Sequence, residues 1–355
     1  MAETSIEWTE RSWNPIVGCT IVSPGCTNCY AMGMADRFKD VYRGRKWAGM
    51  PAEAMTRRVN GKAVWTGHLT LAPDHILTEP LRRRKPTTYF VNSMGDLFHE
   101  DTPEEWIDLV IAIMALCPQH TFQILTKRGE RMRKHMSPTT SIPMLGRLPL
   151  ERVHIAAAGD IEGENGLFEA LKRYGNLYSL YCSVPWPLPN VWLGISAEDQ
   201  RHADERVHEL LATPAAVRFV SNEPALGPVD YTRLQLAYGR WLNALTGELW
   251  TPGHAGENSF TTRGPKLDWI IVGGESGRDA RPMHPDWPRR IRDACVSSGT
   301  AFFFKQWGDY LPAGQTMANG RPWNPGCGSS LRGTKAIVGR FLDGVEHNAM
   351  PEAHR

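Results

Sequence analysis

The chain has 355 residues, of which 41% are hydrophobic and 22% are charged, and its formal net charge is +2. This length suits one large domain or two ordinary ones with a sizeable core, and the small net charge gives no global signal for nucleic-acid binding. No stretch reaches the roughly 18 consecutive apolar residues of a membrane span, and the polar N-terminus lacks the apolar segment of a signal peptide. We therefore expect a cytoplasmic protein that makes no contact with a membrane.

Six short runs rich in Val, Ile and Phe predict six strands. The runs are 89–93, 122–126, 191–196, 217–221, 269–273 and 301–305. Near-continuous apolar runs are typical of parallel strands buried on both faces. Helical patterns lie between most of them, at 103–117, 199–212 and 285–298, and the first has Thr102 as its expected N-cap and Pro103 at its first position. This alternation predicts an α/β fold with a parallel sheet, and six or seven units favour a partial or full (β/α) barrel over a doubly wound sheet.

Two segments interrupt the strand–helix rhythm. Residues 136–189 hold weak elements and a Pro-rich exit, and residues 230–266 contain a Gly-, Thr- and Asn-rich tract. Both are interpreted as insertions, in places where lids over a site occur. We therefore expect a barrel domain over residues 1–310 that carries these two insertions. The Gly- and Pro-rich residues 311–355 form a C-terminal extension that either wraps the barrel or frays.

Polar and charged residues follow the C-terminal end of each predicted strand. In a (β/α) barrel this edge carries the active site, although polar residues also begin ordinary loops. The pattern favours the functional interpretation. The candidates that it gives are Ser93, Gly95, Asp96, Lys127, Arg128, Ser196, Glu198, Glu223, Gly273, Gly274, Glu275 and Lys305.

Three of the seven cysteines, Cys19, Cys26 and Cys29, lie in one Gly- and Pro-containing loop with the spacing C-x6-C-x2-C. In a reducing compartment such a cluster indicates metal or redox chemistry, and thiolates suit zinc or iron–sulfur clusters. A structural zinc site needs four ligands, and no second cysteine pair follows, although His68 or His75 could supply the fourth. Three thiolates leave one iron of a four-iron cluster open, as catalysis requires. The sequence therefore favours a [4Fe-4S] cluster over zinc.

The other four cysteines are dispersed along the chain. Cys117 and Cys295 lie in apolar helical patterns, where a cysteine is most often a small buried hydrophobe. Cys182 and Cys327 have no role that the sequence can assign.

The cysteine loop, with Tyr30 directly after the last cysteine, resembles the cluster loop of radical S-adenosylmethionine (SAM) enzymes, whose commonest spacing is C-x3-C-x2-C. The longer first gap departs from that pattern. Further segments resemble a three-Cys-motif family of phages and bacteria suspected to be of the radical SAM type. The resemblance covers most of the chain and is weakest in the two insertions. It is carried by residues 13–19, 92–99, 125–128, 192–198, 219–224 and 272–277.

The resemblance implies that Cys19, Cys26 and Cys29 hold a [4Fe-4S] cluster whose open iron binds the amino and carboxylate groups of SAM. One-electron cleavage of SAM then leads to hydrogen abstraction from a substrate carbon, which is chemistry that the cofactor supplies. The resemblance also implies which residues bind each part of SAM. Ser93, Gly95 and Asp96 would bind the amino group, Ser196 and Glu198 the ribose or carboxylate, and Gly273, Gly274 and Glu275 would approach the adenine. Tyr30 is also expected to bind the cofactor.

The cations at this edge allow two interpretations. Lys127, Arg128 and Lys305 would pair either with the SAM carboxylate or a substrate phosphate, or with a neighbouring glutamate on the same rim. Glu223 would be either a substrate ligand or a loop anchor. Lys127 and Glu223 are the candidates for a catalytic role besides the cysteines.

The resembled family's association with phages suggests modification or isomerisation of a DNA base or nucleotide in a bacterial or phage-infected cytoplasm, with a reductase or flavodoxin-type electron donor. Abundant tryptophan and the basic run 82–85 give slim support, because tryptophans are usually core and a short basic run is usually a solvated face. Two alternatives remain. One is a zinc-stabilised nucleic-acid-binding protein without catalysis, and the other is an electron-transfer iron–sulfur protein, which would prefer four cysteines.

Overall fold

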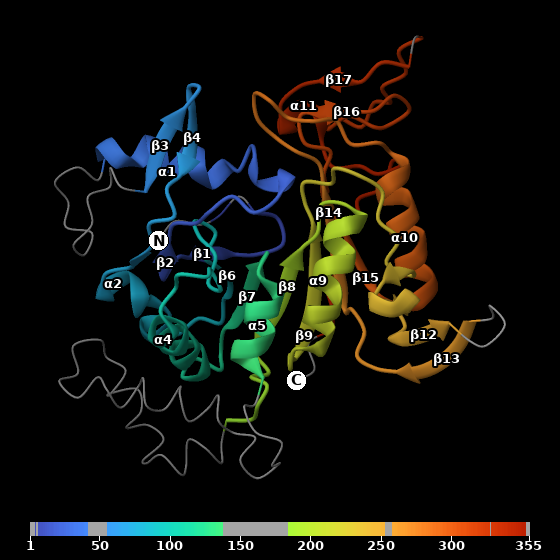
Figure 1. The fold of residues 1–355 in the computed structure, drawn as a ribbon. Helices are drawn as coiled ribbons and strands as arrows, with labels where there is room; N and C mark the ends of the chain where they lie inside the picture. Colours follow the sequence, from blue (N-terminus) through green and yellow to red (C-terminus); the bar gives the residue numbers. More distant parts are fainter. Residues whose placement is uncertain are drawn as a thin grey trace.

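A seven-stranded parallel sheet forms the centre of the molecule (Figure 1). The computed structural model describes residues 4, 6–41, 55–137, 184–252, 258–326 and 328–352. The sheet curls into a half-barrel, so the predicted α/β class with a parallel sheet is confirmed, and the shape is compatible with a partial (β/α) barrel. Its strands, in spatial order, are β1 (Arg11–Trp13), β6 (Thr88–Val91), β7 (Thr121–Thr126), β8 (Val191–Ser196), β9 (Val217–Asn222), β14 (Trp269–Gly273) and β15 (Ala301–Gln306).

All six predicted strands are present, with ends that differ by two residues at most. The seventh strand, β1, was not predicted because its sequence Arg-Ser-Trp is short and mostly polar. It lies at the edge of the sheet and pairs with β6 alone, with Arg11 opposite Tyr89 and Trp13 opposite Val91. An edge strand needs fewer apolar residues than a central one, so the pattern of buried runs does not reveal it.

Aromatic side chains fill the concave side of the half-barrel. Trp8 contacts both Phe90 on β6 and Trp269 on β14, with ring centroids 4.8 and 6.1 Å apart. Three strands separate β6 from β14 in the sheet, so one side chain can reach both only across the concave face. Trp192, Phe219 and Phe303 complete this cluster.

Helices cover the opposite, convex face. They are α4 (Glu104–Ala115), α5 (Gly129–Met136), α9 (Gln200–Ala212) and α10 (Asp286–Ser298). The predicted helices are confirmed to within two residues, with one correction at the start of α4. There Pro103 has an extended backbone (ψ 139°) and serves as the N-cap in place of Thr102, so the first helical residue is Glu104. Because both faces of the sheet are covered, its six predicted strands are mostly apolar, whereas the edge strand β1 is mostly polar.

Short elements before β6 surround the cysteine loop. They are β2 (Ile16–Val17), a 3-10 turn η1 (Pro24–Cys26), α1 (Tyr30–Val41), β3 (Thr56–Val59), β4 (Lys62–Trp65), β5 (Thr70–Leu71), α2 (Asp74–Leu77) and α3 (Glu79–Arg82). The antiparallel pairs β2–β5 and β3–β4 stand apart from the main sheet. The basic run 82–85 precedes the start of β6, so it lies at the edge of the sheet opposite the strand ends that carry the candidate residues.

Part of the second predicted insertion forms a separate antiparallel sheet. Its elements are β10 (Leu234–Gln235), a 3-10 turn η4 (Ala237–Gly239), β11 (Trp241–Asn243), β12 (Glu248–Pro252) and β13 (Asn258–Arg263). Most of the first predicted insertion, residues 138–183, lies outside the described residues, as do Cys182 and Cys327. Cys117 and Cys295 are both fully buried, as predicted.

The C-terminal part contains β16 (Tyr310–Leu311), β17 (Leu331–Arg332) and α11 (Lys335–Val338), and the chain then returns to the sheet. The carbonyl of His347 accepts a hydrogen bond from the backbone N–H of Phe304 at 2.9 Å. The Trp269 indole donates to the carbonyl of Ala349, also at 2.9 Å. None of the helices in the described ranges is long and apolar enough to cross a membrane.

Candidate functional site

A cavity of about 850 Å³ opens at the C-terminal ends of the parallel strands. The edge that carries active sites in (β/α) barrels is therefore hollow in this chain. Most of the predicted site residues line the cavity: Cys19, Cys26, Cys29, Tyr30, Ser93, Gly95, Asp96, Lys127, Arg128, Ser196, Glu223, Gly274, Glu275 and Lys305.

The start of the cysteine loop is held by two close backbone approaches. Gly18 has a φ of +108°, and a Cβ on it would lie 2.1 Å from the carbonyl oxygen of His68, so the position requires glycine. Its N–H donates to the carbonyl of Met94 at 3.1 Å, and Gly18 bridges to Gly95. A Cβ on Gly95 would lie 2.9 Å from the carbonyl oxygen of Ile16. These contacts place the loop directly against the segment that follows β6.

The three thiols lie in different electrostatic surroundings. Burial raises the pKa of Cys19 to about 12, and Asp96 adds to the rise while Arg128 opposes it. Burial also disfavours the thiolate of Cys26, but the Lys127 ammonium and nearby hydrogen bonds outweigh it, so the pKa of Cys26 is lowered. Burial raises the pKa of Cys29, although backbone N–H groups at the start of α1 partly offset the rise.

The donor set consists of three thiols that line one cavity, and thiolates suit both iron–sulfur clusters and zinc. Within the described ranges, no three His, Cys, Asp or Glu side chains are gathered so that they could hold one metal ion. Zinc needs its ligands about 2.3 Å from one atom, whereas each thiolate of a [4Fe-4S] cube binds a different iron, so the sulfur atoms stand farther apart. The three cysteines share one cavity, and His68 and His75, the possible fourth zinc ligands, are exposed and outside its lining.

Each cation at the rim is paired with a carboxylate of the protein. Arg128 binds Asp96 at 2.9 Å, Lys305 binds both oxygens of Glu223 at 2.7 and 2.9 Å, and Lys127 binds Glu198. These are ion pairs of the kind expected on the rim, and contact with a SAM carboxylate or a substrate phosphate stays a prediction. The pKa of Lys127 is lowered to about 8, chiefly because its ammonium is buried.

Glu198 is an anchor below the cavity and is not part of its lining. Its side chain is fully buried, and its carboxylate accepts hydrogen bonds from Lys127, from the Ser23 hydroxyl at 2.5 Å and from Arg206 at 3.0 Å. A Cβ on Gly25 would lie 2.3 Å from the nearer Glu198 oxygen. Glu198 therefore ties the end of β8 to the cysteine loop.

Glu275 makes a second tie to the same loop. Both of its oxygens accept hydrogen bonds from the Arg281 guanidinium, at 2.8 and 2.6 Å. Arg281 also donates to the carbonyl of Pro24 at 3.0 Å. Glu275 thus holds an arginine that binds the cysteine loop at a second point.

One comparison with known proteins identifies the family. The profile of the family described as "Protein of unknown function (DUF5131)" matches residues 3–351. The chain belongs to the DUF5131 family. Neither the curated proteins nor the solved structures contain a match to it.

Other predicted residues of this DUF5131 chain have structural partners. Asp96 accepts four hydrogen bonds: from Thr126 at 2.6 Å, from the N–H groups of Phe98 and Lys127, and from Arg128. A carboxylate has about four acceptor sites, so the set is full. The Tyr30 hydroxyl donates to the carbonyl of Ser93 at 3.0 Å.

Gly273, the last residue of β14, and Gly274 allow two strand ends to approach closely. A Cβ on Gly274 would lie 2.0 Å from the carbonyl oxygen of Trp307, so packing alone explains this glycine. Gly273 lies behind the cavity lining, where a Cβ would meet the Glu223 carboxylate at 3.1 Å. The Ser196 side chain faces the cavity, while its carbonyl accepts a hydrogen bond from Arg206 at 2.8 Å.

Sequence reasoning missed Ser23, Arg206 and Arg281, which hold the cysteine loop in place. Ser23 could have been noticed from its place between the cysteines. Arg206 and Arg281 belong to no motif, and only the folded chain brings them to Glu198 and Glu275.

Proposed function

We propose that this protein is a radical SAM enzyme in which Cys19, Cys26 and Cys29 bind a [4Fe-4S] cluster. One observation carries the proposal: the three thiols, separated by six and two residues, line a single cavity at the C-terminal edge of a parallel half-barrel. When bound, the cluster and SAM supply the one-electron cleavage of SAM that leads to hydrogen abstraction from a substrate. The protein supplies binding, orientation and electrostatics.

The residues of the chain perform the supporting tasks. Glu198 and Arg281 fix the cysteine loop at two points, which holds the thiols in place before any ligand arrives. Trp8 and Phe90 line the cavity from the concave side of the half-barrel and keep water out of that part. The volume of about 850 Å³ lies within the range of roughly 300–1,000 Å³ that cofactor and substrate sites occupy.

The proposed substrate is a DNA base or nucleotide, and the reaction is a modification or isomerisation. This part of the proposal rests on the resemblance to a family associated with phages. A reductase or flavodoxin-type protein would donate the electron, and the cytoplasm is the proposed location. The basic run 82–85 lends no support, because it lies at the opposite edge of the sheet from the cavity.

The test is anaerobic reconstitution with iron and sulfide, followed by reduction with dithionite and addition of SAM. We expect four irons per chain, a brown cluster and formation of 5′-deoxyadenosine, which chromatography detects. Cys26→Ala should abolish both the cluster and the product. Cys295→Ala is the matched control, because Cys295 is buried in α10 and does not line the cavity, and it should retain both.

The same experiment separates the alternatives. A colourless protein that holds one zinc ion would refute the proposal and support a zinc-stabilised binding protein. A brown cluster that leaves SAM intact would also refute it, and would support an electron-transfer protein.

A further inference from the structure

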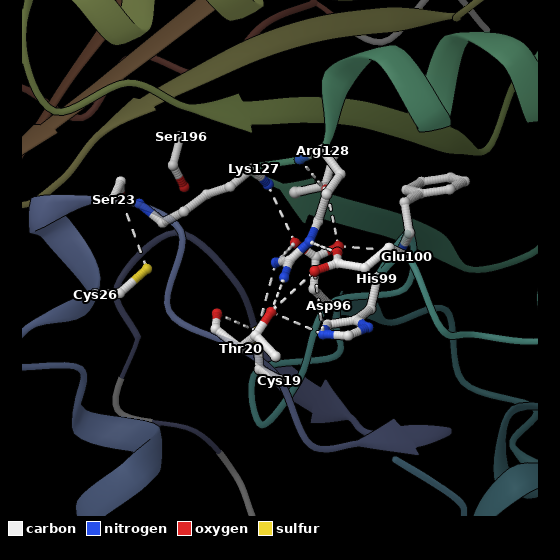
Figure 2. Close-up of polar contacts among 12 residues, drawn as sticks. Cys19, Thr20, Ser23, Cys26, Asp96, His99, Glu100, Lys127, Arg128 and Ser196 are labelled. Carbon is white, nitrogen blue, oxygen red and sulfur yellow. Dashed lines mark hydrogen bonds and ion pairs between the residues drawn. The ribbon is translucent and has the colours of Figure 1, made fainter. Parts of the chain in front are cut away.

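The side chain of Arg128 reaches the first cysteine of the loop. Arg128 lies two residues after the end of β7, and its side chain is 10% exposed. Its Nη1 lies 3.5 Å from the sulfur of Cys19, within the range of an N–H···S hydrogen bond. Figure 2 shows the guanidinium beside Cys19, between Thr20, Asp96 and Glu100.

Three oxygen acceptors hold the guanidinium in this position. Nη1 also donates to Asp96 at 2.9 Å, Nη2 donates to the Thr20 hydroxyl at 2.7 Å, and Nε donates to Glu100 at 2.8 Å. A guanidinium is planar and does not lose its proton in proteins. The hydrogen bond to the sulfur is therefore part of a rigid and permanently charged arrangement.

We propose that Arg128 is a positioning residue that raises the reduction potential of the cluster through Cys19. This inference rests on the proposed function, because it requires the cluster. Reduction adds one electron, supplied by the external donor, and so adds one negative charge to the cluster and its thiolates, with no bond made or broken. Hydrogen bonds to the sulfurs and nearby charge are established determinants of cluster potential, and a cationic donor stabilises the more negative, reduced state.

The acids around Arg128 make the proposal specific. Asp96 acts electrostatically on Cys19, and both Asp96 and Glu100 bind the guanidinium that donates to the sulfur. Removing Arg128 both deletes the hydrogen bond and leaves these two carboxylates unscreened. Removing Glu100 instead leaves the hydrogen bond and deletes a negative charge. The two changes should therefore shift the potential in opposite directions, which a loss of structure would not do.

The experiment is a redox titration of the loaded protein followed by electron paramagnetic resonance, with no SAM and no turnover. For Arg128→Met we expect the ratio of reduced to oxidised cluster at a fixed potential to fall about tenfold, which is about 59 mV for a one-electron couple. Arg128→Lys keeps the charge but not the planar fork, and should shift in the same direction by less. Glu100→Gln should shift the potential the opposite way, and by less because Glu100 is 54% exposed.

Arg133→Met is the control for loss of an arginine charge. Arg133 lies in α5, pairs with Glu209 and does not line the cavity. The midpoint potential of the cluster in Arg133→Met should therefore equal that of the wild type. A fully loaded Arg128→Met with the wild-type midpoint overturns the inference. If Arg128→Met does not fold or load, unchanged midpoints in both Arg128→Lys and Glu100→Gln overturn it. A wild-type chain that binds no iron and sulfide is recognised before any titration, and that result overturns the proposed function itself.

Discussion

Replacing Glu198 with glutamine should destabilise the protein strongly, although the change is only one of charge. The side chain is fully buried, and its two oxygens serve two cations, Lys127 and Arg206, as well as the hydroxyl of Ser23. Glutamine keeps one oxygen and presents an NH2 group to the other side. One cation then loses its acceptor and faces a donor, and neither cation retains a countercharge at this position.

The size of the effect follows from burial. Breaking a buried ion pair on one side costs about 3–5 kcal/mol. The side chains of Lys127 and Arg206 are 17% and 8% exposed, so water can solvate them only in part, and we expect about 3 kcal/mol for Glu198→Gln. Total stabilities of about 5–15 kcal/mol make such a loss readily measurable.

Urea unfolding followed by tryptophan fluorescence measures this loss, with Glu130→Gln as the matched control. Glu130 pairs with Lys134 four residues on, and both side chains are 65% exposed, so its replacement should leave the urea midpoint close to that of the wild type. A free energy of unfolding for Glu198→Gln within 1 kcal/mol of the wild type would refute the role of Glu198 as the anchor of the cysteine loop.

Three further predictions concern α1, pH and thiol reactivity. Gly33 is an exposed glycine inside α1 with open space around it, so Gly33→Ala should raise the free energy of unfolding by about 0.5–1 kcal/mol; a decrease in urea unfolding would contradict this. Burial would raise the pKa of Glu100, but the hydrogen bond from Arg128 outweighs it and lowers the pKa from 4.5 to about 2. A carboxylate whose pKa is lower in the folded state contributes its full stabilisation above pH 4.5 and loses it as the pH falls towards 2. The urea midpoint of Glu100→Gln should therefore fall less than that of the wild type over this interval. In the metal-free protein at pH 8, iodoacetamide should label Cys26 before Cys19, because the pKa of Cys26 is lowered whereas that of Cys19 is raised; peptide mass spectrometry that finds Cys19 labelled first would refute the assignment.

Much of the fold was predictable because burial leaves a clear pattern. The six predicted strands are largely buried on both faces, and the helix α9 begins at a recognisable cap, Asp199, whose side chain accepts a hydrogen bond from the N–H of His202. The strand β1 was not predictable, since an edge strand of three residues carries too little pattern. The packing role of Trp8 was also not predictable, because its contacts with β6 and β14 exist only once the sheet has curled.

The sequence located the candidate site but not its internal pairing. The expectation that the C-terminal strand ends carry the active site selected twelve candidate residues, and most of them line one cavity. Which carboxylate each cation binds depends on distances across neighbouring strands, as for Lys305 on β15 and Glu223 after β9. Glu198 was expected to contact a ligand, yet its burial against Arg206 depends on the packing of α9 over β8, which no local motif records.

The return of the chain to the sheet near its C-terminus has a practical consequence. Residues 347–349 cover the outer edge of β15, where Phe303 bridges to Asn348 and Phe304 donates to His347. An uncovered edge of this kind offers a row of free backbone donors and acceptors to any passing chain. A chain truncated before residue 341 should therefore self-associate, whereas an affinity tag fused after residue 352 leaves the covered edge of β15 intact.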